Sequence, residues 1–287
     1  MSNEQPNVEQ GIDYWNTQPA TYDGVLGGFG TGSLPRVDAL GSRLFLLNLF
    51  PELCIVPSAF RRLNAPADQP RARALDVGAG IGRVTSDVLL PLVSDVVILE
   101  PVDAFVQEAL LRARNSASNP SKGAWPGLAD QSKSVTILQG TLQDFHPLRP
   151  HHARFLDRVG YQSPNPVKEI GLGFDVIWCQ WCLGHLTNVD LIAFLRRCCK
   201  SLSRNPRSLI VVKENLCPNG PGNTPTEIFD EQDSSLTRSD LAWKAFFEQA
   251  ELRLNIEGAR GLSCVMLNVK VVYSTQQPRR AHAGLYS

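Results

Sequence analysis

The sequence predicts an α/β fold in which a mostly parallel sheet is covered by helices on both faces. Short apolar runs alternate with amphipathic stretches of about a dozen residues, as strands and crossover helices do in this class. Several of these runs are apolar without interruption, which is typical of strands buried on both sides. The chain has 287 residues, of which 43% are hydrophobic and 20% are charged, so its composition is that of a globular protein.

The first half of the sheet is predicted from two apolar runs and the helical patterns that follow them. Residues 72–77 form a short apolar run that leads into a glycine-rich turn, and residues 83–93 then have amphipathic helical spacing. The run at 95–100 is followed by helical spacing at 102–114. Each strand and the helix after it therefore have the order expected of a parallel crossover unit.

The second half adds further strands, and the last two are expected to pair antiparallel. These strands are expected at residues 135–138, 174–179, 208–212, 252–256 and 265–273, which makes seven in all. A helix is expected at 189–202, capped by Thr187 or Asn188, and another from Ser235 to about Ala250. Because the connection between the last two strands is short, a C-terminal hairpin should end the sheet in an antiparallel strand.

Three parts are expected along the chain. Residues 1–70 are interpreted as an N-terminal helical extension that includes a glycine-rich lid, residues 71–275 as the α/β domain, and residues 276–287 as a flexible tail. Two stretches rich in Ser, Asn, Pro and Gly, at 115–133 and 147–173, are expected to be surface insertions. Neither insertion carries a pattern that predicts a chemical role.

The charge balance and the cysteines argue against several classes of protein. Lysine and arginine number 28, as do aspartate and glutamate, so no electrostatic argument favours a nucleic-acid or membrane partner. No apolar run approaches the roughly 18 residues of a membrane helix, and the N-terminus lacks the apolar core of a signal peptide. We therefore expect a soluble intracellular protein with reduced thiols. Cys179 and Cys182 form a lone Cys-x-x-Cys pair, so no metal site is expected.

The turn from Asp76 to Gly82 is the strongest chemical signal. Its Gly-x-Gly-x-Gly spacing, between a strand and a helix, differs from the Gly-x-Gly-x-x-Gly of dinucleotide sites. Glu100 ends the next strand, where a carboxylate can accept hydrogen bonds from both ribose hydroxyls of a nucleoside. Arg83 can bind a carboxylate in two places, and S-adenosylmethionine has a carboxylate but no pyrophosphate. The pattern favours this cofactor; a nicotinamide cofactor and a glycine turn without a ligand stay open as alternatives.

Short strings along the chain support a more specific comparison. They are Tyr14-Trp15 and the segments 23–30, 76–83, 142–145, 175–181, 184–186, 194–198, 213–215 and 233–235. In these strings the chain resembles the seven-stranded S-adenosylmethionine-dependent methyltransferases, and among them the protein α-N-terminal methyltransferases. The resemblance implies a single Rossmann-like methyltransferase sheet. It also implies a cofactor site, with S-adenosylhomocysteine as the product, made of Gly78, Gly80, Arg83, Glu100, Leu142, Gln143 and Gln180.

The activity that the resemblance implies is methylation of a free α-amino group. The substrate would be a protein that begins Xaa-Pro-Lys or Xaa-Pro-Arg once its initiator methionine is removed. An α-amino group has a pKa of about 7.7–8.0, so at pH 7 most of it is protonated and has no lone pair to attack a methyl group. Asp233 and His185 are the implied general bases. Asn215 would anchor the first peptide unit.

The resemblance also implies contacts for the substrate side chains. The implied substrate-binding residues are Trp15, Leu26, Trp181, Asn215, Asp230, Asp233 and Ser235. Trp181 and Leu26 would enclose the proline ring, although packing in the core is the simpler interpretation of these two without the resemblance. Asp230 and Asp233 would pair with the cation of the third residue. The glycine-rich segment 24–32 would close over the peptide as a lid.

Partners and location are expected from the same family. Ribosomal and chromatin-associated proteins are its usual substrates, so the cytoplasm is expected, with the nucleus as a second compartment. The alternative is a methyltransferase that acts on a small molecule or a nucleic acid, although Asp230 and Asp233 would repel phosphate. An oxidoreductase and a non-catalytic module that holds peptide N-termini are the remaining alternatives.

Overall fold

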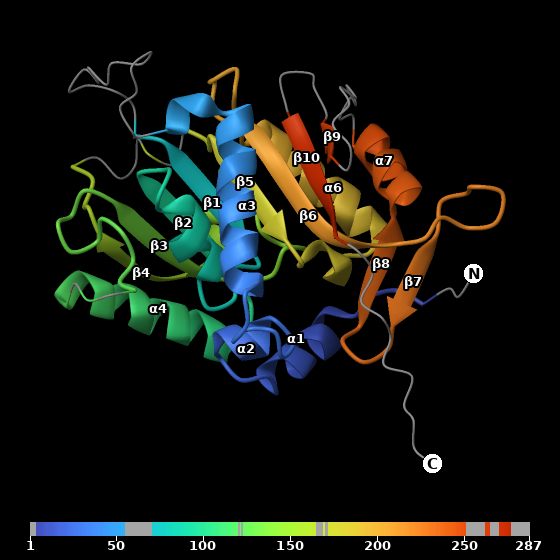
Figure 1. The fold of residues 1–287 in the computed structure, drawn as a ribbon, viewed down its shortest axis with the longest axis horizontal. Coiled ribbons are helices and arrows are strands. Elements are labelled where there is room, and N and C mark those ends of the chain that lie inside the picture. The colour runs from blue at the N-terminus through green and yellow to red at the C-terminus, as the bar shows by residue number, and fades with distance from the viewer. Residues whose placement is uncertain are drawn as a thin grey trace.

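The structure, a computed structural model, has the predicted α/β architecture, with one mixed sheet between two layers of helices (Figure 1). It describes residues 4–54, 71–119, 121, 123–164, 169, 172–250, 262–264 and 270–276. The predicted strand at 252–256 lies outside the described residues, as does the expected tail apart from Gln276.

Helices and strands alternate along most of the described chain. The helices are α1 (Val8–Asn16), α2 (Tyr22–Val25), α3 (Leu34–Leu49), η1 (Pro51–Leu53), η2 (Thr85–Leu89), α4 (Asp103–Ser118), η3 (Pro150–His152), η4 (Leu183–His185), α6 (Asn188–Lys200) and α7 (Asp240–Gln249). The strands are β1 (Arg73–Val77), β2 (Asp95–Glu100), β3 (Ser134–Gln139), β4 (Arg154–Gly160), β5 (Val176–Gln180), β6 (Leu209–Cys217), β7 (Glu227–Asp230), β8 (Ser235–Ser239), β9 (Leu262–Cys264) and β10 (Lys270–Gln276).

The main sheet has the strand order β4-β3-β2-β1-β5-β6-β10-β9. All pairs between β3 and β10 on this path are parallel. The two edge strands are antiparallel: β4 pairs with β3, and β9 pairs with β10. The expected mostly parallel sheet with an antiparallel C-terminal hairpin is therefore confirmed.

The predicted count of seven strands is wrong, because eight strands lie on this path among the described residues. Two strands on this path have no counterpart in the prediction. One is β9, in the connection expected between the last two strands, and the other is β4, in the stretch 147–173 that we expected to be a surface insertion. Its sequence, Arg154 to Gly160, is rich in charge, and its first two residues are exposed. An edge strand obtains its hydrogen bonds from one neighbour and needs little burial, so no apolar pattern marked it.

Two predicted helices differ in the structure. The helix expected at 83–93 is short, and its centre is the π-helical segment η2. The helix expected from Ser235 begins only at Asp240, because Ser235–Ser239 forms β8, which pairs with β6 and β7. Ser239 then caps α7 by accepting the N–H of Ala242. Of the two N-caps that the sequence offered for α6, Thr187 is the cap: its side chain accepts the N–H of Asp190, and Asn188 is the first helical residue.

Each face of the sheet is covered by its own set of helices. On one face, side chains such as Leu75 and Leu99 pack with buried residues of α6 and α7, among them Phe194 and Phe247. On the other, alternate strand residues pack with α3, η2 and α4. This alternation explains the continuous apolar runs, because both sides of each central strand are buried.

The N-terminal segment contains the helices that the sequence predicted. Figure 1 shows α1 and α2 below the central strands, between α4 and β7, whereas α3 lies across the face of the sheet. Leu46 of α3 is fully buried, and Ala39 is nearly so, which anchors this helix in the core. Among the described helices, none combines the length and the apolar content that crossing a bilayer requires.

Candidate active site

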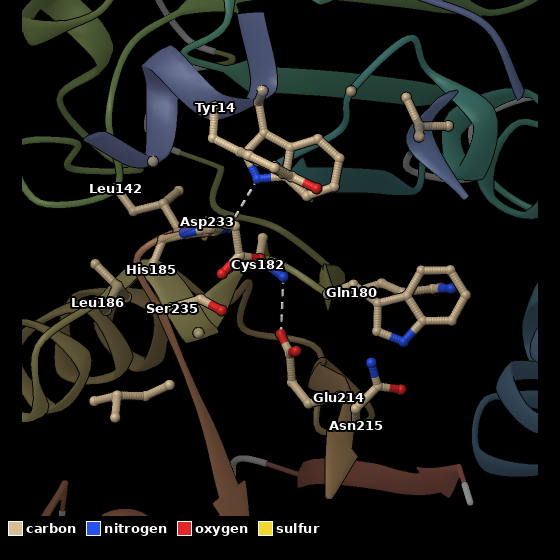
Figure 2. Close-up of a pocket in the computed structure, with 18 of the residues that line it drawn as sticks. Tyr14, Leu142, Gln180, Cys182, His185, Leu186, Glu214, Asn215, Asp233 and Ser235 are labelled. Carbon is tan, nitrogen blue, oxygen red and sulfur yellow. Dashed lines mark hydrogen bonds between the residues drawn. The ribbon is translucent and has the colours of Figure 1, made fainter. Parts of the chain in front are cut away.

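A cavity of about 670 Å³ lies where the loops after β1, β2, β5 and β6 meet α1 and the β7–β8 hairpin (Figure 2). Of the predicted site residues, those that line it are Gly78, Gly80, Arg83, Glu100, Leu142, Gln143, Gln180, Trp15, Trp181, His185, Asn215, Asp230, Asp233 and Ser235. Leu26 does not line it: this side chain is 1% exposed, and its neighbour Val25 forms the wall instead. The topology therefore gathers segments from the whole chain at one edge of the sheet.

Two of the three glycines in the loop after β1 are closely packed against neighbouring side chains, and the third faces open space. Gly78, Gly80 and Gly82 have φ values of +61°, +56° and +77°, a region that favours glycine. A Cβ on Gly78 would lie 2.4 Å from the Cβ of Cys182, and one on Gly82 would lie 2.4 Å from the Trp125 ring. At Gly80 the nearest atom would be 3.6 Å away, so this glycine leaves room in the cavity.

Glu100 joins the glycine loop to the end of β2. One carboxylate oxygen accepts the N–H of Gly80 at 2.7 Å, and the other accepts the N–H of Val102 at 2.9 Å. Burial raises the pKa of Glu100 to about 7. Each oxygen keeps a second lone pair, so the carboxylate can also accept hydrogen bonds from hydroxyl groups in the cavity.

Arg83 and Gln180 are held by an acidic residue that the sequence analysis missed. Asp38 of α3 accepts a hydrogen bond from Arg83 Nη1 at 2.6 Å and one from Gln180 Nε2 at 3.1 Å. Gln180 in turn accepts the indole N–H of Trp178 at 3.0 Å. The signal was weak: Asp38 shares the buried face of α3 with Ser42, one turn further on, and both look like ordinary helix residues in the sequence.

His185 lies under helix α1. The indole N–H of Trp15 donates to His185 Nε2 at 3.0 Å, and a Cβ on Gly11 would lie 3.1 Å from Nδ1. The N–H of Asn7, the residue that caps α1, donates to Ser234 Oγ at 2.8 Å and ties this helix to the β7–β8 hairpin. Because the Nε2 lone pair is occupied, neutral His185 carries its proton on Nδ1.

Four residues that line the cavity have a buried polar atom with no hydrogen-bond partner among the described residues: His185 (Nδ1), Asp233 (Oδ1), Trp181 (Nε1) and Trp243 (Nε1). Burial lowers the pKa of His185, and the Asp233 charge opposes this shift. Most buried polar atoms in proteins are hydrogen-bonded, so a group of orphans in one cavity indicates where a ligand completes the bonding.

The end of β6 forms another wall, on which Figure 2 shows Glu214 and Asn215. Glu214 accepts the N–H groups of Cys182 and Leu183, both at 2.9 Å, and thereby holds the turn after β5. Burial raises the pKa of Glu214 to about 7. Trp181, in the same turn, has a φ of +58°, which is uncommon for a residue with a side chain. Such strain is frequent at functional sites.

The rim of the cavity is more open. Asp230 is exposed and accepts the N–H of Gln232 at 2.9 Å, while Ser235 pairs with Asp230 across the β7–β8 hairpin. The glycine-rich segment 24–32 is compact: a Cβ on Gly30 would lie 2.3 Å from the backbone nitrogen of Asp23. Its role as a lid stays a prediction.

The family described as AdoMet-dependent proline di-methyltransferase matches residues 3–273 of this chain. The chain belongs to this family. An α-N-terminal protein methyltransferase 1 from Schizosaccharomyces pombe is 35% identical over 242 residues, which cover 84% of this chain and 83% of that protein. The protein of the same name from Arabidopsis thaliana is 32% identical over 274 residues, which cover 95% of this chain and 81% of that protein.

Solved structures agree with this membership. A SAM-dependent methyltransferase from Leishmania major superposes with a TM-score of 0.53 at 25% sequence identity. The match covers 86% of this chain and 74% of that one. The expected Rossmann-like methyltransferase fold and the resemblance to the N-terminal methyltransferases are therefore confirmed.

As a member of the AdoMet-dependent proline di-methyltransferases, the protein uses S-adenosylmethionine, and its cavity fits this cofactor. Gly80 leaves space beside the loop, Glu100 presents carboxylate oxygens from the end of β2, and buried Arg83 presents a positive charge to the cavity. These three groups match the adenosine and the carboxylate of the cofactor. When bound, S-adenosylmethionine supplies an electrophilic methyl group.

Proposed function

We propose that this protein methylates the free α-amino group of proteins that begin Xaa-Pro-Lys or Xaa-Pro-Arg after removal of the initiator methionine. A relative from Xenopus tropicalis, 32% identical over 84% of this chain, is named N-terminal Xaa-Pro-Lys N-methyltransferase 1. The observation that carries the proposal is a carboxylate oxygen of Asp233 that has no hydrogen-bond partner in the described part of the chain. It lies beside His185, inside the same cavity as the glycine loop. A buried acceptor of this kind suits an ammonium group.

The chemical task of the site is to remove a proton before methyl transfer. Asp233 attracts the α-ammonium group and accepts its proton, after which the nitrogen lone pair attacks the methyl carbon and the bond between carbon and sulfur breaks. His185 is assigned as the second base because its Nε2 lone pair accepts the indole N–H of Trp15. This lone pair can accept a proton only after that hydrogen bond has broken. Each further methyl transfer requires the amine to lose another proton to one of these groups.

The cavity walls also suit a peptide N-terminus. Asn215 is half-buried and offers an amide to the first peptide unit, and the Trp181 indole offers an apolar face to proline. Leu26 lies behind the wall, so it supports this contact only through its neighbours. Asp230 and Asp233 present carboxylates to the third residue, beside the Ser235 hydroxyl.

Trp15 and the cellular partners complete the proposal. The Trp15 ring lines the cavity next to His185, where it can stack on a methylated ammonium group. Ribosomal and chromatin-associated proteins with the required N-terminal sequence are the proposed partners, and cytoplasm and nucleus are the proposed locations.

The proposal is tested with a free Ser-Pro-Lys peptide, S-adenosylmethionine and the purified protein, with mass spectrometry of the products. We expect methyl groups on the α-nitrogen of this peptide. An N-acetylated copy and a Ser-Leu-Lys copy are the controls and should stay unmodified. If the free Ser-Pro-Lys peptide gained no methyl group, the proposal would be wrong, and methylation of RNA instead would favour the nucleic-acid alternative.

A further inference from the structure

A buried ionic cluster lies behind the cofactor half of the cavity. The Asp38 carboxylate is fully buried and accepts hydrogen bonds from Arg83, Gln180 and Lys213. Lys213 also donates to Ser42 Oγ at 3.0 Å. These residues come from α3, the loop after β1, the end of β5 and β6, so the cluster exists only in the folded chain.

The charges of this cluster do not cancel. Burial lowers the pKa of Lys213, and the Asp38 charge opposes this shift. With Lys213 protonated, two cations share one carboxylate, and the side chains of Arg83 and Lys213 are only 6% and 9% exposed. Burial alone would raise the pKa of Asp38, but Lys213 and Arg83 together lower it, so Asp38 is ionised. Asp76 interacts with Arg83 but binds the Thr85 hydroxyl, and burial raises its pKa to about 7, so it offsets less than a full charge.

The surplus positive charge is located at the cavity wall. Arg83 lies 5.4 Å and Lys213 Nζ 6.0 Å from the centre of the Trp181 ring, which lines the cavity. Arg83 and Gln180 line the cavity themselves, whereas Asp38 and Lys213 do not. A buried unbalanced charge is costly unless a ligand of opposite sign completes it.

We infer that Asp38 and Lys213 are positioning residues for the carboxylate end of S-adenosylmethionine. Asp38 holds the two cavity-lining donors, Arg83 and Gln180, in place, and Lys213 balances Asp38 so that Arg83 keeps its attraction for an anion. Helix α3 thereby contributes to cofactor affinity although none of its residues lines the cavity. The inference rests on the cofactor of the family and is independent of the proposed peptide substrate.

The test compares two ligands by calorimetry. S-adenosylhomocysteine carries the amino-acid end, and 5′-methylthioadenosine has the same adenosine and sulfur but lacks that end. We expect Lys213→Met to lower the affinity for S-adenosylhomocysteine about tenfold, as for the loss of one charge-assisted interaction. The affinity for 5′-methylthioadenosine should stay unchanged. Lys213→Arg keeps the charge and should keep both affinities. Lys244→Met, which removes a lysine paired with Asp240 on α7, is the matched control.

Asp38→Asn probes the second half of the inference. Arg83 and Gln180 then lose their common charged acceptor. The affinity for S-adenosylhomocysteine should therefore fall, and the affinity for 5′-methylthioadenosine should not. Thermal unfolding followed by circular dichroism shows whether each variant is folded, and the Lys213 variants decide the question if Asp38→Asn does not fold. The inference is wrong if Lys213→Met changes the affinities for both ligands by the same factor, or changes neither affinity.

Discussion

The two halves of the cavity differ in how completely their polar groups are paired. In the cofactor half, Glu100 accepts two backbone N–H groups, and Arg83 and Gln180 share Asp38. In the substrate half, His185 Nδ1 and Asp233 Oδ1 have no partner among the described residues. The first half is organised before a ligand arrives, while the second keeps free groups for a substrate that must lose a proton. Mutations should therefore separate binding of the cofactor from turnover.

The largest effect is expected at Asp233. Asp233→Asn keeps the size of the side chain but cannot accept a proton, so turnover should fall by about 10²- to 10⁴-fold, the range for a lost general base. The affinity for S-adenosylhomocysteine should stay as in the wild type. Steady-state kinetics and calorimetry measure the two quantities, and near-normal turnover would remove Asp233 from its assigned role.

The opposite pattern is expected at Glu100. In the wild type, both carboxylate oxygens of Glu100 accept backbone N–H groups. In Glu100→Gln, the amide N–H₂ group replaces one of these acceptors, so one of the two hydrogen bonds is lost. Affinity for S-adenosylhomocysteine should fall by about tenfold or more, while turnover at saturating S-adenosylmethionine stays close to normal. A variant that lost turnover at saturation but bound the cofactor normally would contradict the division of the cavity into two halves.

A shift in pH dependence is expected from Trp15. The indole N–H of Trp15 donates to His185 Nε2 and so favours the neutral imidazole. This hydrogen bond and burial both lower the pKa of His185. Trp15→Phe removes that bond, so the pKa of His185 rises and a higher pH is needed to keep the imidazole neutral. The acidic limb of kcat/KM against pH should move to higher pH. A limb that did not move would show that His185 does not control it.

The smallest effect is expected at the rim. Asp230 is exposed, and exposed ion pairs contribute roughly 0.2–1 kcal/mol, so Asp230→Asn should raise KM for a Ser-Pro-Lys peptide by about fivefold at most. A peptide with norleucine in place of lysine is the control, and its KM should be the same for both proteins. An equal rise for the two peptides would point to a change of rim structure and not to recognition of the cation.

The chemistry-bearing residues were predictable where local pattern and chemistry coincide. The glycine spacing before Arg83 and the acid that ends β2 indicated the cofactor, and nearly all predicted site residues line one cavity. Leu26 was the exception, because exposure of a single leucine depends on which neighbour the turn places in the wall. The strand β4 and the β7–β8 hairpin were missed, since many of their side chains are partly or fully exposed and no apolar run marks them.

The sequence by itself determined the order of the central parallel strands and the residue types available for catalysis, because hydrophobic period and turn chemistry act over a few neighbouring positions. Only the tertiary structure decided that Asp38 lies against Arg83 and Lys213, and that Trp15 bonds His185 across 170 positions of sequence. Such contacts depend on how α1 and α3 pack onto the sheet. The interaction between buried charged groups becomes strong only after that packing has excluded water.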